Sequence, residues 1–387
     1  MLIHTVVQGD TVFSIARKYS VSPIKIIENN GLIYPDHLIP GQKLLILTPT
    51  RTYIVRGGDT VSKICRRFGI KKNTLLSNNP SLHGRQQLHA GTELVIHYDA
   101  PLYSAAALNG YVYNCTSADR FYTLLPYLTY VTFSSVEKSM HQWIEEASKE
   151  GKIPLLRIHW KDLFFECGDK WENFEVKVTN AKELGFRGFA LTSPYRGISC
   201  EDAGAFVFEI KKKLLGMDML LFQELETEES AYYLDVADGI VALYEKCHKK
   251  EVPSFLEGEQ KTLEAFTGKI EAGKAFLELS SFGYDSEKCL TMDQIFKIGI
   301  KYGAEIYNDE EKLVSYLDYT HYKNGEKKPL RIYFESLENI KAKLELMHEL
   351  GFMGATVDVG RVPISYIMML YNTFARVENP YTGFFGV

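Results

Sequence analysis

The sequence predicts a multidomain protein: two small α+β units with βααβ topology, followed by an α/β barrel of the TIM type, (β/α)8. Two observations predict it. Residues 4–47 and 53–96 are an internal repeat with matching turns, and the remaining chain alternates short apolar runs with amphipathic helical segments. We expect the first unit at residues 2–48, the second at 52–98 and the barrel at 104–380.

The first unit begins with a short alternating strand at residues 4–7 and a Gly9-Asp10-Thr11 turn. Asp and Thr side chains accept hydrogen bonds from the unpaired N–H groups of a first helical turn, so this turn predicts a helix start. A second helix begins at Pro23 and ends at Asn30-Gly31, and residues 43–47 form the closing strand. The second unit repeats this order, with Gly58-Asp59-Thr60 as its turn.

The rest of the chain contains eight runs that we expect to form barrel strands, with helices between them. Functional residues of such a barrel sit at the carboxyl ends of the strands. The strands are Leu108–Tyr113, Thr129–Phe133, Ile153–Ile158, Gly188–Leu191, Met219–Phe222, Gly239–Leu243, Ala275–Leu279 and Gly354–Val359. The intervening helices include Phe174–Leu184, Cys200–Leu214, Met292–Tyr302 and Leu337–Leu350.

Composition excludes several functional classes. The net charge of −5 over 387 residues gives no basic face for nucleic acid. No segment approaches the roughly 18 uncharged apolar residues of a membrane-spanning helix. The first residues, Met1-Leu2-Ile3-His4, lack the pattern of a secretory signal, so we expect synthesis in the cytoplasm. The six cysteines show no metal-ligand spacing and suggest buried thiols; no metal or cofactor is predicted, and the oligomeric state stays open.

The two repeats resemble LysM domains in their Gly-Asp-Thr turns, their asparagines after the second helix and their closing glycine turns. That family binds N-acetylglucosamine polymers, peptidoglycan or chitin, in a groove between the loop after the first strand and the loop after the second helix. The resemblance implies glycan contacts at Gly9, Asp10, Thr11, Asn30, Gly31, Leu32 and Ile33, and at Gly58, Asp59, Thr60, Asn79 and Leu82. Pro80-Ser81 stands where the first unit has Gly31-Leu32, so the second groove departs further from the pattern.

The barrel resembles glycoside hydrolase family 18, closest to the branch joined to LysM pairs in bacterial spore-cortex and cell-wall lytic enzymes. The resemblance rests on residues 181–189, residues 239–245, and residues 333–336 with 354–357, the last pair matched to the final strand–helix–strand of that family. Family 18 enzymes cleave with an Asp-x-Glu pair after the fourth strand, where the Glu protonates the leaving oxygen. Here Thr192 and Pro194 occupy those positions. Loss of a general acid costs about 100- to 10,000-fold in rate.

Another carboxylate could replace the missing acid, and Glu224 is the first candidate, followed by Glu245. The simpler interpretation is that barrel mouths collect polar residues because they face water. Other residues expected at the barrel cleft are Trp160, Tyr244 and Asp358, the last standing where the family has a tryptophan on its eighth strand.

The leading hypothesis from the sequence is therefore a protein that binds peptidoglycan or other N-acetylglucosamine polymers at the bacterial (spore) cell envelope and whose barrel has lost its catalytic pair. The alternative is an active glycoside hydrolase, chitinase-like or an N-acetylglucosaminidase, which cleaves peptidoglycan with a displaced Glu.

Overall fold

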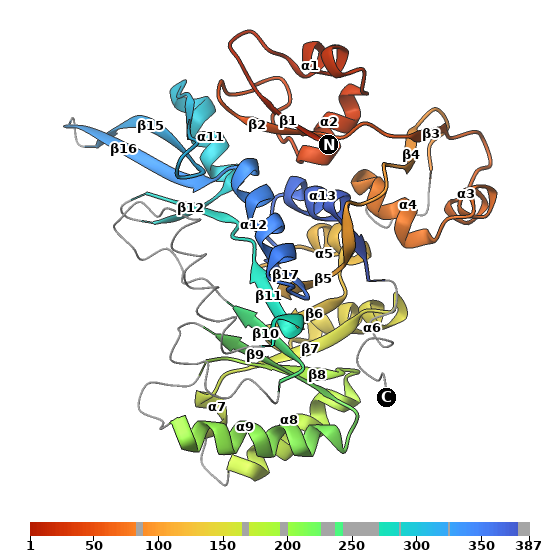
Figure 1. The fold of residues 1–387 in the computed structure, drawn as a ribbon, viewed down its shortest axis with the longest axis vertical. Helices are drawn as coiled ribbons and strands as arrows, with labels where there is room; N and C mark the ends of the chain where they lie inside the picture. Colours follow the sequence, from red (N-terminus) through yellow and green to blue (C-terminus); the bar gives the residue numbers. More distant parts are fainter. Residues whose placement is uncertain are drawn as a thin grey trace.

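The computed structural model describes residues 1–82, 88–164, 170–193, 200–225, 237–242, 271–285, 288–323 and 326–377 (Figure 1). Each repeat forms two helices against a two-stranded antiparallel sheet, as predicted. The elements of the first unit are β1 (Leu2–Thr5), α1 (Val12–Tyr19), α2 (Pro23–Asn30) and β2 (Lys43–Ile46). Those of the second unit are β3 (Arg51–Ile54), α3 (Val61–Phe68), α4 (Lys72–Asn78), η1 (Pro80–Leu82) and β4 (Glu93–His97).

The predicted helix caps are confirmed in both units. The Thr11 hydroxyl accepts a hydrogen bond from the Ser14 N–H, and the Thr60 hydroxyl accepts one from the Lys63 N–H. These bonds satisfy first-turn donors that would otherwise have no partner in the helix. The Gly-Asp-Thr turns therefore set where α1 and α3 begin.

The barrel is also confirmed, with eight parallel strands and closure between the last and the first, β17 and β5. Each predicted strand overlaps an observed one. The strands are β5 (Tyr103–Val112), β6 (Tyr130–Phe133), β7 (Ile153–Ile158), β8 (Gly188–Leu191), β9 (Leu220–Leu225), β10 (Gly239–Ala242), β11 (Ala275–Glu278) and β17 (Gly354–Asp358). The helices around them include α5 (Ala118–Leu124), α6 (His141–Lys149), α7 (Lys161–Phe164), α8 (Lys170–Glu183), α9 (Cys200–Leu215), α12 (Leu337–Glu349) and α13 (Ile364–Thr373), after which β18 (Phe374–Arg376) pairs with β5.

One part of the predicted barrel is wrong. Residues between β11 and α12 form a five-stranded antiparallel sheet covered on one face by a helix, so the Met292–Tyr302 helix is not a barrel crossover and residues 333–335 are not a barrel strand. The physical reason is the alternating pattern of a sheet with one solvated face, in which Leu317 and Ile332 pack toward the helix. The elements are β12 (Phe282–Tyr284), β13 (Cys289–Thr291), α11 (Met292–Tyr302), β14 (Ile306–Asp309), β15 (Val314–Lys323) and β16 (Glu326–Glu335).

The expectation of six buried thiols is also wrong in detail. Cys289 is disulfide-bonded, whereas Cys115 is an exposed thiol and Cys65 is partly buried. Among the residues that the structure describes, no helix is long and apolar enough to cross a membrane.

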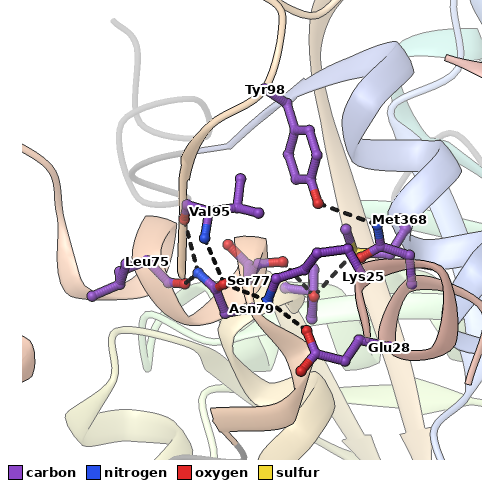
Figure 2. A network of polar contacts seen from close by, with 10 residues as sticks. Lys25, Glu28, Leu75, Ser77, Asn79, Val95, Tyr98 and Met368 are labelled. Carbon is purple, nitrogen blue, oxygen red and sulfur yellow. Dashed lines mark hydrogen bonds and ion pairs between the residues drawn. The ribbon is translucent and has the colours of Figure 1, made fainter. Parts of the chain in front are cut away.

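The two small units are joined by buried polar contacts (Figure 2). The Lys25 ammonium on α2, only 2% exposed, donates to the Glu28 carboxylate at 2.6 Å and to the Asn79 side-chain oxygen at 3.2 Å. Asn79 belongs to the second unit, where its amide donates to the backbone oxygens of Leu75 and Val95. Because a buried ammonium needs such partners, the contact fixes one unit against the other.

Both units also dock on the rest of the chain, and Figure 1 shows the first unit beside α11 and α13. On the second unit, the Ser77 carbonyl accepts from the Tyr127 hydroxyl at 2.5 Å. On the first unit, the Pro40 carbonyl accepts from the Ile306 N–H of β14 at 2.8 Å, and Lys43 pairs with Glu338 at 2.6 Å. The edge strand of the inserted sheet is therefore covered by the first unit.

The turn at Gly41 allows a direct test of this docking. A Cβ at Gly41 would lie 1.7 Å from the Ile306 carbonyl oxygen, whereas a Cβ at Gly91, the matching position of the second unit, would meet no atom within 4 Å. Both glycines have a positive φ, so alanine costs about 1–2 kcal/mol of strain at either position. We expect Gly41→Ala alone to displace the first unit from β14.

Hydrogen exchange at the Ile306 amide measures that displacement. Its protection should fall by about tenfold or more in Gly41→Ala and stay near the wild-type value in Gly91→Ala. Equal protection in the two variants would contradict the docking described above.

Candidate functional site

The first loop of the first unit is held by the Asp10 carboxylate. It accepts hydrogen bonds from the His4 ring at 3.0 Å and from the Val7 N–H at 2.9 Å. Partial burial by itself would raise the pKa of the Asp10 carboxyl. The hydrogen bonds and the nearby His4 lower it by more than that, so the pKa is below the usual value. Asp10 therefore shapes the turn, while Gly9 and Thr11 are the exposed members of this predicted glycan loop.

The second loop of the first unit combines a locked asparagine with exposed apolar atoms. The Asn30 amide donates to the Ile26 and Leu45 carbonyls, and its oxygen accepts from the Leu45 N–H at 2.7 Å. The amide and the oxygen of the Asn30 side chain are therefore both hydrogen-bonded to backbone groups and hold the shape of the loop. Gly31 lies against Ile364 of α13, Leu32 is partly exposed, and Ile33 is 57% exposed.

In the second unit the two predicted loops differ in exposure. Gly58 and Thr60 are exposed, and Asp59 accepts from the Arg56 N–H and from the Tyr53 hydroxyl, which together hold its pKa below the usual value. Asn79 is fully buried and Leu82 is 7% exposed, because α2 and α5 pack over this loop. The side chains of Asn79 and Leu82 therefore support the domain interface in this structure.

A buried ion pair between Arg157 and Glu224 lies inside the barrel, near the carboxyl ends of β7 and β9. Glu224 is two residues after Phe222 on β9, so both side chains face the interior, where Phe222 packs against Tyr130 and Phe276. Both Glu224 oxygens accept from the Arg157 guanidinium, at 2.7 and 2.6 Å, and Oε1 also accepts from the Tyr111 hydroxyl at 2.8 Å. Glu224 is 0% exposed.

Sequence reasoning named Glu224 but missed Arg157 and Tyr111. Burial lowers the pKa of the Arg157 guanidinium, but its hydrogen bonds and charge attraction to Glu224 outweigh that effect and raise it. The available signal was register: Arg157 follows the interior residue Leu155 by two positions on β7, which places it on the inner face of the barrel.

Of the two positions matched by sequence to the Asp-x-Glu pair, Thr192 lies in the described part of the chain and has a structural role. The Thr192 hydroxyl, buried at the end of β8, accepts from the Trp160 N–H at 3.2 Å. Trp160 is 1% exposed and packs against Phe206 of α9, so its ring lies in the core and does not line an open cleft in this structure. Pro194, Tyr244 and Glu245 lie outside the described residues.

Asp358 lies at the end of β17, as expected for the eighth barrel strand, and is half-buried. Burial raises the pKa of its carboxyl above the usual value, although Arg361, paired with it at 2.9 Å, and the Gly360 N–H favour the charged form. In the described ranges, no group of three His, Cys, Asp or Glu side chains is arranged to hold a metal ion.

Comparison with known proteins identifies the repeats. The LysM domain family matches residues 4–47 and 53–97. The chain is 35% identical over 120 residues to YdhD and 34% identical over 110 residues to the cell wall-binding protein YocH, both of Bacillus subtilis. These alignments cover 31% and 27% of this chain, and only 27% and 37% of the two relatives.

Similarity of structure extends over the whole chain. The spore cortex-lytic enzyme SleL of Bacillus megaterium matches 97% of this chain and 98% of its own, with a TM-score of 0.74 and 20% identity. A chitinase of Chromobacterium violaceum matches 70% of this chain and 99% of its own, with a TM-score of 0.60 and 10% identity. At these identities the likeness concerns the fold. Residues 4–47 and 53–97 are two LysM domains, and the third domain shares its barrel fold with SleL and that chitinase.

Proposed function

We propose that this protein binds N-acetylglucosamine polymers of the bacterial cell envelope, peptidoglycan above all, and that its barrel is not catalytic. The observation that carries the proposal is the pair of LysM domains, because this family binds peptidoglycan or chitin-like glycans. The likeness to a cell wall-binding protein and to a spore cortex-lytic enzyme supports an envelope location, with the spore as the favoured site.

Exposure favours the first LysM domain as the main binding site. Its second loop presents Ile33 and the backbone after Gly31, while the corresponding loop of the second domain is covered at Asn79 and Leu82. The second domain still exposes Gly58 and Thr60. Two linked sites on one polymer, even if unequal, raise the overall affinity through effective concentration.

The geometry around Glu224 supports an inactive barrel. A general acid must carry a proton and present it to the leaving oxygen. Glu224 instead uses both oxygens as acceptors for one guanidinium, and its own side chain is 0% exposed. Thr192 stands at the position matched to the family's Asp, and its hydroxyl accepts a hydrogen bond from the Trp160 backbone N–H.

The second candidate function is a glycoside hydrolase that uses another carboxylate, with Glu245 as the remaining sequence candidate. The observation in its favour is the near-complete match of fold to the spore cortex-lytic enzyme SleL. A single assay for released reducing ends separates this candidate from the binding protein.

Binding to insoluble peptidoglycan should be measurable by co-sedimentation, without release of reducing ends. We expect Ile33→Ala to weaken binding about fivefold, because an exposed apolar contact for the acetyl methyl is lost. Ile24→Ala is the matched control, since Ile24 is 61% exposed in the same domain, on α2, outside this loop. Absence of co-sedimentation by the wild-type protein would refute the proposed function.

Glu224→Gln should destabilise the protein without changing any glycan assay. Removing one partner of a buried ion pair leaves the other uncompensated, so we expect a loss of about 3 kcal/mol in the free energy of unfolding by urea. Tyr111→Phe, which removes one hydrogen bond to the same carboxylate, should cost about 1 kcal/mol. Release of reducing ends by the wild-type protein, abolished in a folded Glu224→Gln variant, would instead establish Glu224 as the acid.

A further inference from the structure

A pocket of about 370 Å³ lies where the first LysM domain meets the barrel and the inserted sheet. One wall is the predicted glycan loop, residues 30–33. The opposite walls come from α11 and from residues 360–364 between β17 and α13. The volume falls within the range of about 300–1,000 Å³ that is typical of small-ligand sites. The other predicted loop of this domain, residues 9–12, does not line the pocket.

Arg120 is a fixed donor group of the pocket. Arg120, from α5, donates from Nε to the Val359 carbonyl at 3.3 Å and from Nη2 to the Val362 carbonyl. These two bonds set the plane of the guanidinium against the 360–364 wall. Because the carbonyls do not cancel its charge, Arg120 can still attract an acceptor group of a ligand.

The acceptor group of the pocket is Asp293, in the first turn of α11. The residue is exposed on one side, but partial burial raises the pKa of its carboxyl, and the Arg120 charge opposes that effect. Within the described part of the chain, no side chain donates a hydrogen bond to this carboxylate. Arg120 and Asp293 carry opposite charges, and Arg361, which also lines the pocket, is paired with Asp358. The charges of the lining are therefore largely balanced, which favours a polar uncharged ligand over an ion.

The apolar part of the lining comes from three parts of the chain and includes Ile33 of the LysM loop, Ile364 of α13 and Phe296 of α11. Aliphatic side chains can receive a methyl group, and an aromatic ring can pack against the C–H face of a sugar ring. An N-acetylated sugar offers an acetamido N–H, a carbonyl, hydroxyls and a methyl, which match the carboxylate, the guanidinium and these walls.

We propose that the glycan site of the first LysM domain is composite, and that α11 of the inserted sheet completes it as a pocket for one N-acetylated amino sugar of the polymer. The inference rests on the proposed glycan-binding function and adds residues outside the LysM domain to it. Asp293 accepts from the acetamido N–H or a hydroxyl, and Phe296 packs against the sugar. The LysM loop alone forms one side of this site.

Titration calorimetry of the full chain with the N-acetylglucosamine hexamer tests the composite site. Asp293→Asn and Phe296→Leu should each raise Kd about fivefold, because each removes one contact and keeps the approximate side-chain volume. Asp119→Asn and Phe208→Leu are the matched controls. Asp119 is likewise in the first turn of a helix, α5, and Phe208 is an exposed phenylalanine of α9; neither lines the pocket.

The outcomes separate the two proposals. If the wild-type protein and all four variants bind the hexamer equally, the composite site is refuted and the LysM function stands. If the wild-type protein does not bind the hexamer, both the composite site and the proposed glycan-binding function are refuted. The glucose hexamer, which has the same β-1,4 linkage and no acetamido group, should bind at least about tenfold more weakly, and equal affinity would refute recognition of the N-acetyl group.

Discussion

The arrangement of this protein depends on the buried contact between Lys25 and Asn79. An ammonium that is 2% exposed is stable only when its charge and donors are matched, here by Glu28 and by the Asn79 oxygen. The same asparagine holds its own loop through Leu75 and Val95. One polar network therefore joins the two LysM domains, and separate contacts hold the pair on the rest of the chain.

This rigid arrangement makes the two LysM domains unequal. The loop that contains Asn79 and Leu82 is buried by α2 and α5, while the corresponding loop of the first domain remains exposed and faces α11. A duplicated sequence unit thus acquires two different environments. Packing of the Pro40-Gly41 turn against β14 holds the first domain in its place.

The centre of the barrel is filled by charged and aromatic side chains that satisfy one another. Arg157, Glu224 and Tyr111 form a closed set of hydrogen bonds above the aromatic layer of Tyr130 and Phe222. Both carboxylate oxygens of Glu224 accept hydrogen bonds within this group, which suits a structural role. At the end of β8, the Thr192 hydroxyl accepts a hydrogen bond from the Trp160 backbone N–H.

The sequence by itself determined the elements whose signals are local. Thr11 and Thr60 cap helices through bonds three residues away, the repeat identified both LysM domains, and eight apolar runs located the barrel strands. Only the tertiary structure revealed the inserted sheet, the partner of Glu224 and the pocket beside Ile33. Arg157 is separated from Glu224 by 67 residues, and Asp293 reaches the first LysM domain only through folding. Contacts of this kind depend on which strands become neighbours, and no local pattern encodes that pairing.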